Sequence, residues 1–297
     1  MEQEELERYR KAGRIASTAL REGAAMIKPG ILLRDVLDKV EARIEAMGGG
    51  IAFPAQLSLN EVAAHYCPSQ EDDTAFQEGD VVKLDVGAHV DGRIADNALT
   101  VDLGSHEDLL KASKEALHAA LKIAVPGTTL DELGRTIQET ITSHGFKPVR
   151  NLSGHGLGHY QVHTPPSIPN TPTGDKTVLR EDMTIAIEPF ATDGEGAIQE
   201  GGNPTVFSPA AMKPTRSPYA RQVAGKLRGY HGLPFTTRWL EKEFGAGKTR
   251  LALRELQRNG SVTAHPPLPE RRGGLVSQHE HSVIVKDKPV IYTWPED

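Results

Sequence analysis

Cysteine is nearly absent from this chain of 297 residues, which contains only Cys67. A single cysteine excludes any disulfide within the chain. No run of 18 apolar residues occurs, so the sequence predicts no membrane-spanning helix. The charged, amphipathic first residues also lack the apolar core of a secretory signal. Together these absences favour a cytoplasmic protein with no membrane contact.

The charge of the chain is unevenly distributed. The net charge is -6, but residues 211–272 contain 13 Lys and Arg against 4 Asp and Glu, so the remainder is strongly acidic. Hydrophobic residues make up 38% and charged residues 25%, which is typical of a globular protein. The asymmetry indicates a basic segment with a role of its own.

Two segments that lie 97 residues apart repeat one pattern. In residues 27–49 and again in residues 123–146, a Pro-Gly pair precedes apolar residues at helical spacing, and a glycine follows them. Each copy leads on to a strand pattern with one acidic residue, Asp85 in the first and Glu188 in the second. The repeat predicts an α+β fold of two pseudo-symmetric halves, with a site between them that takes acids from both.

Residues 81–104 have the pattern of a β-hairpin. Asp91-Gly92 is a strong signal for a two-residue turn between two alternating segments. That turn sets a register in which Asp85 and Asp96 lie on one face as diagonal neighbours, with Cβ atoms about 7 Å apart. The hairpin therefore brings two carboxylates together.

Four acids, Asp85, Asp96, Glu188 and Glu280, each lie in an apolar strand pattern. A solvent-facing side is the ordinary place for two aspartates of a hairpin, but the neighbours here are apolar or small. Buried together without counterions, four carboxylates would raise one another's pKa. Two divalent metal ions would neutralise them, so the pattern favours a two-metal site.

Three histidines, His155, His159 and His163, lie four residues apart in GHGLGHYQVH. On a helix this spacing would place them on one face. The three glycines of the segment disfavour a helix, because each costs about 1 kcal/mol relative to alanine. The segment is therefore predicted as loop or strand, in which one or two of the histidines reach a site and each has a hydrogen-bonded structural role as its alternative.

Five segments carry a family resemblance. In chain order they are AFPAQLSLNEVAAHYCP, KLDVGAHVDGRIADNALTV, NLSGHGLGHYQVH, TIAIEPFA and QHEHSVIV. Together they resemble the methionine aminopeptidases of the pita-bread fold over nearly the whole chain. The NLSGH segment and the insertion before the last segment resemble the type II branch, and the short N-terminus resembles archaeal members. The resemblance implies duplicated α/β halves around a curved antiparallel sheet.

The resemblance also implies a set of metal ligands: Asp85, Asp96, His155, Glu188 and Glu280. These residues would hold two divalent ions. Asp96 and Glu280 would bridge them. Asp85 would complete one site, and His155 with Glu188 would complete the other. Oxygen and nitrogen ligands without a thiolate suit Mn, Fe, Co or Zn and do not select among them.

The implied activity is metal-dependent removal of the N-terminal methionine from nascent proteins and peptides, by a water or hydroxide that bridges the two ions. Glu188 would act as general base. His65 would contact the scissile amide, and His163 would donate to the developing oxyanion. Phe53 and Val162 would form the wall of an apolar methionine pocket. The enzyme would act on nascent polypeptide N-termini as a monomer.

Three residues depart from the family pattern. His159 is not at a ligand position, and no role is assigned to it. Cys67 is interpreted as a small residue near the site that is sensitive to oxidation. His279 stands where an aromatic residue is usual, and strand alternation directs it away from Glu280 while Gln278 shares the face of Glu280.

The basic segment is predicted to be an insertion, residues 194–272, within a catalytic domain of residues 1–193 and 273–297. Three short helices are expected, within residues 218–232, 236–245 and 249–260, and they resemble the winged-helix-like insertion of type II enzymes. Two roles remain open. The insertion is either a lid that shapes the cleft or a contact to ribosomal RNA, whose phosphates would attract its positive charge.

Two other functions remain open as well. A peptidase for Xaa-Pro substrates has the same fold and ligands, but such relatives usually carry a separate N-terminal domain, whereas here a helical pattern begins within the first dozen residues. A non-catalytic binding protein of the same fold would have lost ligands, and all five are present here.

Overall fold

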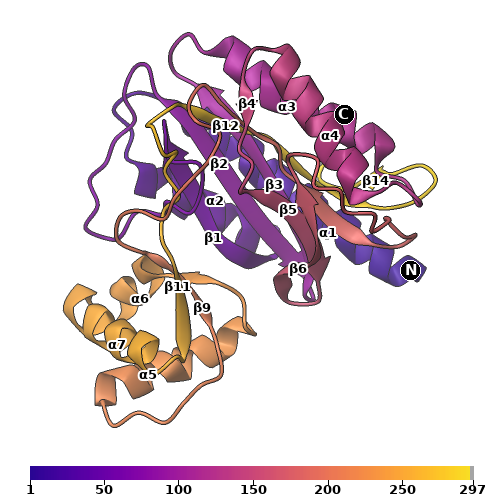
Figure 1. Ribbon diagram of the computed structural model, residues 1–297. Coiled ribbons are helices and arrows are strands. Elements are labelled where there is room, and N and C mark those ends of the chain that lie inside the picture. Colours follow the sequence, from indigo (N-terminus) through magenta and orange to yellow (C-terminus); the bar gives the residue numbers. More distant parts are fainter. Residues whose placement is uncertain (295–297) are drawn as a thin grey trace.

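The computed structural model describes residues 1–294 and is built around a large antiparallel sheet (Figure 1). Its hydrogen-bonded path runs through β1 (Gly50–Leu59), β2 (Val81–Val90), β3 (Arg93–Asp102), β13 (Glu280–Ile284), β7 (Thr184–Ile187), β5 (Ser153–Gly158) and β6 (Gln161–Pro169), and β14 (Val290–Ile291) pairs with β13. Strand β13, near the end of the chain, thus joins the strands of the first half to those of the second.

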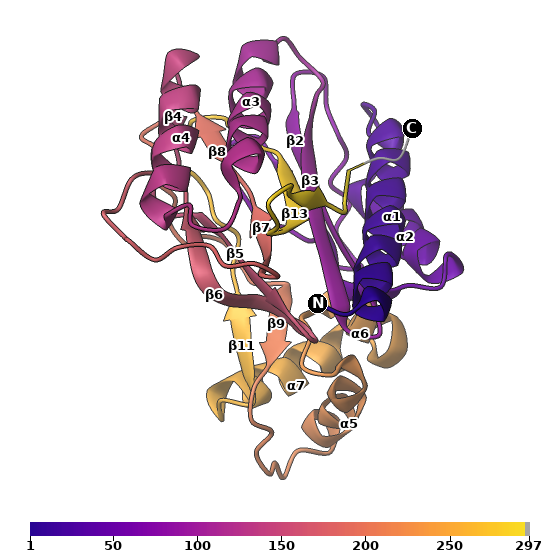
Figure 2. The same cartoon turned by 90° about the vertical axis from the view of Figure 1, so that its right-hand side faces the viewer.

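Two helix pairs cover one face of this sheet: α1 (Gln3–Met26) with α2 (Leu33–Ala46), and α3 (Glu107–Ile123) with α4 (Leu130–Ser143). Apolar strand residues pack beneath them in two clusters, Leu84 in the first and Ile185 in the second. Side chains alternate along a strand, so Asp85 and Ala186 face the other side. Figures 1 and 2 show the helices outside a curved sheet, which is the predicted arrangement of two pseudo-symmetric halves.

The repeat in the sequence corresponds to helices α2 and α4 and their flanks. Gly30 and Gly127, of the two Pro-Gly pairs, both adopt positive φ angles, 86° and 94°. Glycine populates this region at little cost, which explains why it precedes each helix. Thr129 also caps α4 in a reciprocal capping box with Glu132. The duplication inferred from sequence is therefore a duplication of local structure.

The hairpin of β2 and β3 has the predicted register. Gly87 pairs with Asp96, and Asp85 pairs with Ala98. The ring of Phe53 lies over Gly87, where a Cβ atom would approach it to 2.1 Å. Gly87 is thus required by the close approach of a side chain from β1.

The smaller elements of the body form a second sheet of β4 (Lys147–Pro148), β8 (Phe190–Thr192) and β12 (Val276–Gln278). Residues 206–265 form a separate unit at one end of the body, drawn in orange in Figures 1 and 2. It contains β9 (Val206–Pro209), α5 (Pro218–Leu227), η1 (Arg228–Tyr230), β10 (Phe235–Thr236), α6 (Thr237–Phe244), α7 (Ala246–Arg258) and β11 (Val262–His265). The unit has its own apolar core. The three predicted helices are confirmed, and no helix within residues 1–294 is both long and apolar enough to cross a membrane.

A buried cluster of charges ties this unit to the body. The guanidinium of Arg238, fully inaccessible to solvent, donates to Asp38 and, over 2.8 Å, to Glu41 Oε1. The indole of Trp239 donates to Glu41 Oε2 over 2.8 Å, and Lys242 pairs with Asp38 over 2.6 Å. Helix α6 is therefore held on α2, and its preceding loop is fixed against the body.

Candidate active site

Two neighbouring rows of paired residues cross the inner face of the sheet. In one row Asp85 pairs with Ala98, and Ala98 pairs with Glu280. The other row contains Gly87 paired with Asp96 in β2 and β3, and Ser282, Ala186 and His155 paired in sequence across β13, β7 and β5. The Ser282 hydroxyl accepts from the Asp96 amide and donates to its carbonyl, which links the two parts of this row. Small residues lie between the functional ones in both rows, which leaves space on this face of the sheet.

The five residues expected as metal ligands line one cavity of about 240 Å³. Ligand atoms of Asp96, His155 and Glu280 lie within 4.8 Å of one another. His155 Nε2 is 3.7 Å from Asp96 Oδ2 and 3.7 Å from Glu188 Oε1, too far for a hydrogen bond. His155 Nε2 and the nearby carboxylate oxygens therefore surround a common space without hydrogen bonds between them.

Several carboxylate oxygens of this cluster are buried and have no hydrogen-bond partner among the described residues: Asp85 Oδ1, Asp96 Oδ1 and Glu280 Oε1. Unpaired buried oxygens are rare because each loses its hydration. Gln278 Nε2 donates to Glu188 Oε2 over 3.2 Å, but no lysine or arginine faces the cluster in the described chain. The cluster therefore fits cations supplied from outside the chain.

The protonation of this cluster reflects burial and mutual repulsion. Burial raises the pKa of Asp85 to about 7. Burial raises the pKa of Asp96, Glu188 and Glu280 well above the ordinary range, and the charge of neighbouring carboxylates adds to the rise. Four acids that resist ionisation together in one cavity are the electrostatic signature of a divalent-cation site.

The hydrogen bond that His155 makes through Nδ1 leaves its Nε2 available as a metal ligand. Its Nδ1 lies 3.2 Å from the carbonyl oxygen of Gly156, which can only accept, so Nδ1 carries the proton and Nε2 is free. Burial, followed by the nearby charge of His163, lowers the pKa of His155 to about 3. The imidazole is consequently neutral and presents Nε2 toward the carboxylates.

Three further histidines, one of them not predicted, lie around the cavity: His65, His163 and His265. The His163 ring centroid is 4.2 Å from that of His155. His265, from β11, packs edge-on to His65 at 5.9 Å and bonds Ser208 over 2.8 Å. Burial, then the charges of His265 and His163, lowers the pKa of His65 to about 4. His65 adopts a φ angle of 68°, the strained left-handed region common at functional sites.

An apolar wall closes one side of the cavity. Phe53 and Val162, each about 5% exposed, both line it. They belong to a cluster that also includes Leu233, which lies in the loop before α6. Pro234, the next residue, lines the cavity directly. The residues 206–265 therefore contribute to the site from β9, β11 and this loop.

The three histidines of GHGLGHYQVH do not share a face. His155 is in β5 and His163 in β6, while His159 is exposed in the turn between them, with Nε2 3.0 Å from the Asp91 carbonyl oxygen. Added Cβ atoms at Gly154 and Gly156 would approach backbone oxygens to 2.3 and 2.4 Å. The glycines are thus needed for close strand packing, and the strand prediction is confirmed.

Two other sequence expectations have contrasting outcomes. Cys67 was expected near the site and sensitive to oxidation, but it is fully buried in the main core, and burial raises its pKa to about 11. The expected sensitivity to oxidation is therefore wrong, because a buried thiol with a raised pKa is unreactive. His279 does point away from Glu280, since its Nδ1 bonds Ser113 Oγ of α3 over 2.8 Å.

Comparisons with known proteins agree with one another. Residues 7–206 match the model of metallopeptidase family M24. A methionine aminopeptidase of Archaeoglobus fulgidus is 46% identical over 288 residues, covering 97% of each chain. The crystal structure of a methionine aminopeptidase from Thermotoga maritima, 26% identical, superimposes with a TM-score of 0.73 over 99% of this chain and 98% of that one. The structure of a thermophilic Arx1, 15% identical, shares the fold with a TM-score of 0.89 over 100% of this chain and 92% of that one.

Of the three functions that the sequence left open, the full-length relatives support one. The pita-bread fold, the buried carboxylates and these relatives lead to a single conclusion. The chain belongs to metallopeptidase family M24, among its methionine aminopeptidases, and acts on the N-termini of proteins.

Proposed function

We propose that Asp85, Asp96, His155, Glu188 and Glu280 would hold two divalent ions. The observation that carries this proposal is the convergence of four carboxylates, three of them with a buried unpaired oxygen, in a cavity that no lysine or arginine of residues 1–294 lines. When bound, such ions polarise the scissile carbonyl and make a water nucleophilic near neutral pH. Mn, Fe, Co and Zn are all compatible with this donor set.

Glu188 is the proposed general base. Its Oε2 is fixed by Gln278, and the carboxylate is 14% exposed toward the cavity. His65, in the loop between β1 and β2, and His163, in β6, line the cavity, one from each half of the body. In this proposal His65 contacts the scissile amide and His163 donates to the oxyanion that develops during attack.

The methionine side chain is proposed to bind against Phe53 and Val162. Both belong to the same apolar cluster, and both face the cavity that contains the acids. Leu233 packs into this cluster from the insertion, so we extend the proposed pocket to it. A pocket of apolar side chains beside a few fixed polar groups is the usual form of such a site.

Metal reconstitution tests the metal proposal. The purified protein, stripped of metal and reloaded with Mn, Fe, Co or Zn in turn, is expected to bind two ions per chain and to cleave Met-Ala-Ser. Asp96→Asn is expected to bind fewer ions and Asp287→Asn, at an exposed carboxylate, to bind two. Full activity with one ion per chain would contradict the two-ion site. Unchanged stoichiometry in Asp96→Asn would contradict the ligand assignment.

We further propose that residues 194–272 are an insertion subdomain within a catalytic domain of residues 1–193 and 273–297, the last three of which lie outside the described residues. Eight exposed basic residues of this insertion have no carboxylate partner within residues 1–294: Lys213, Arg216, Arg221, Arg228, Lys248, Arg250, Arg254 and Arg258. Most lie on α5 and α7, which pack side by side. This surface fits a polyanion, and nascent polypeptides in the cytoplasm place ribosomal RNA near the enzyme.

Sedimentation with ribosomes tests this partner. The monomeric wild-type chain is expected to co-sediment at low salt and to dissociate as salt rises, because phosphate contacts release counterions. Arg250→Glu with Arg254→Glu is expected to weaken co-sedimentation and to leave cleavage of Met-Ala-Ser unchanged. Binding that does not depend on salt would contradict the proposal.

A further inference from the structure

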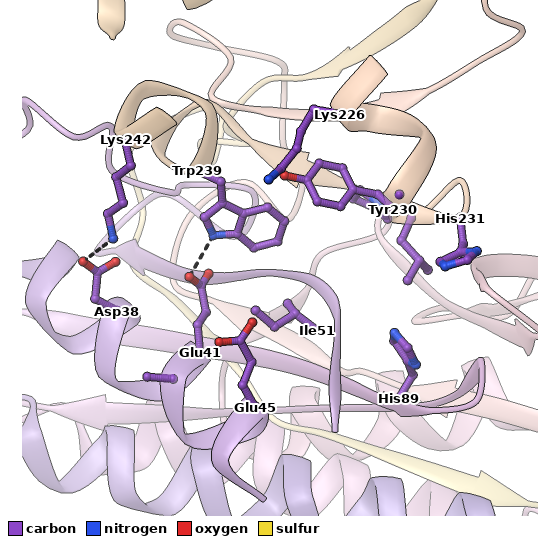
Figure 3. Close-up of a pocket in the computed structure, with 14 residues that line it drawn as sticks. Asp38, Glu41, Glu45, Ile51, His89, Lys226, Tyr230, His231, Trp239 and Lys242 are labelled. Atoms are coloured by element: carbon purple, nitrogen blue, oxygen red, sulfur yellow. Dashed lines mark hydrogen bonds and ion pairs between the residues drawn. The ribbon is translucent and has the colours of Figure 1, made fainter. Parts of the chain in front are cut away.

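A second cavity, of about 530 Å³, lies between the insertion and the body (Figure 3). Helix α2 and β1 of the body form one side, and η1, the following loop and α6 form the other. Pro234 lines both this cavity and the active-site cavity. The two cavities are therefore neighbours, and none of the proposed catalytic residues lines the second one.

Two aromatic rings form the insertion side of this cavity. Tyr230 and Trp239 have ring centroids 5.7 Å apart at an interplanar angle of 59°. Figure 3 shows these rings across the space from Ile51 and Glu45. The position of Trp239 is fixed, because its indole is hydrogen-bonded to Glu41. The cavity thus offers flat, pre-organised surfaces.

The charges around the cavity are paired, with one exception. Lys242 pairs with Asp38 over 2.6 Å, Arg238 pairs with Asp38 and Glu41, and Lys226 pairs with Glu243 over 2.7 Å. The remaining carboxylate, Glu45, lines the cavity and has no partner within residues 1–294. The set retains one uncompensated negative charge, located opposite the aromatic rings.

The histidines at the edge do not cancel this charge. Burial, followed by the charge of His231, lowers the pKa of His89 from its ordinary value, and Asp91 opposes the change only in part. His89 is therefore neutral at pH 7. His231 stacks on Tyr160 with a centroid distance of 4.8 Å, outside the space between Glu45 and the rings.

We propose that this cavity binds an arginine side chain of a polypeptide, with the guanidinium against Glu45 and its plane on Trp239 or Tyr230. A guanidinium is planar, stacks on aromatic faces and forms two parallel hydrogen bonds with a carboxylate. A divalent cation would need several free carboxylates, and only Glu45 is free here. An anion would be repelled by Glu45. The arginine comes from the substrate itself or from a second polypeptide.

Tryptophan fluorescence provides a direct test. The chain has two tryptophans, so Trp294→Phe leaves Trp239 as the single reporter. In that background, N-acetylarginine amide is expected to change the fluorescence along a saturable curve. The citrulline analogue has the same shape but no charge. It is expected to bind about tenfold more weakly, which is the factor for losing one charge-assisted hydrogen bond.

Two variants complete the binding test. Glu45→Gln is expected to weaken the arginine probe about tenfold for the same reason. Glu78→Gln makes the same chemical change at an exposed carboxylate that precedes β2 and does not line the cavity. It is expected to have no effect on binding of the probe. Equal affinity for the arginine and citrulline probes, an unaffected Glu45→Gln, or a signal that does not saturate would each overturn the proposal.

The source of the arginine is identified with substrates. A series of peptides that begin Met-Ala-Ser, with arginine or citrulline at successive later positions, is compared by kcat/KM. If the substrate supplies the arginine, citrulline lowers kcat/KM at one position in the wild type and has no effect in Glu45→Gln. If no position responds while the amide probe binds, the arginine belongs to a second polypeptide. Binding of the amide probe is measured without turnover, so its outcome does not depend on whether the metal proposal holds.

Discussion

Two clusters of acids in this molecule have opposite electrostatic arrangements. In the cluster between α2 and α6, Asp38 and Glu41 receive Arg238, Lys242 and the indole of Trp239. In the active-site cluster, four carboxylates share one cavity, and no lysine or arginine of residues 1–294 lines it. The first cluster is neutralised within the chain, and the second is not.

The difference follows from what each cluster does. Burying a charge is costly unless an opposite charge or several hydrogen bonds compensate it. The interface cluster is compensated as soon as the chain folds, so it can hold the insertion on the body. The active-site cluster stays uncompensated until cations bind. The free energy recovered when the cations neutralise the buried acids therefore contributes to metal affinity.

Metal removal is expected to have the largest effect, and only on the active-site cluster. A chelator should abolish cleavage of Met-Ala-Ser, and ions added back should restore it. Because ions bind the folded chain, saturation at one hundred times Kd should stabilise it by about 2.7 kcal/mol. Thermal unfolding with and without each metal measures this. An unchanged Tm at saturating metal would show that the acids do not form the binding site.

Asp96→Asn is expected to lower activity and, in the metal-free protein, to raise stability. Activity should fall by about 100-fold or more, since even residues that only orient a ligand are worth 10- to 100-fold. In the metal-free protein, however, the same change removes one of the four carboxyl groups whose ionisation is opposed by burial and by their mutual repulsion, so Tm should rise by about 2 °C or more. Calorimetry of stripped protein checks the sign, with Asp287→Asn as control. A lower Tm without metal would contradict the repulsion.

Arg238→Met is expected to have the opposite effect on stability. It leaves Glu41 buried without its cation, which should lower the free energy of unfolding by about 3–5 kcal/mol. Removing the half-exposed partner, in Lys242→Met, should cost only about 1 kcal/mol or less. Denaturant unfolding measures both. The double variant Arg238→Met with Glu41→Gln should recover part of the loss, and no recovery would mean that packing rather than charge dominates.

The fold and the acid cluster could be predicted from the sequence because their signals are local. The Asp91-Gly92 turn sets the register of a whole hairpin, so the neighbourhood of Asp85 and Asp96 follows from chain order. The glycines around His155 rule out a helix for the same local reason. Pro-Gly pairs at a constant offset similarly indicate the duplicated helices.

The contributions of the insertion could not be predicted, because they depend on how a distant segment docks. His265 reaches the site through β11, more than 100 residues after His163, and Leu233 reaches it through the loop before α6. No spacing in the sequence encodes that contact. The burial of the Cys67 thiol could not be predicted for the same reason, since Thr236 of the insertion contacts it over 3.4 Å.

His159→Ala is expected to have the smallest effect and to separate the histidines of GHGLGHYQVH. His159 is exposed, its hydrogen bond goes to the carbonyl of Asp91, and its ring rests on Tyr160 at 4.7 Å, away from the acids. An exposed hydrogen bond contributes about 1 kcal/mol, so kcat/KM on Met-Ala-Ser should change by less than about fivefold. His155→Ala, at the same spacing in the motif, should abolish turnover and lower the bound metal. A hundredfold loss in His159→Ala with metal still bound would mean that Tyr160 transmits its position to Val162 and His163, and that the turn belongs to the site after all.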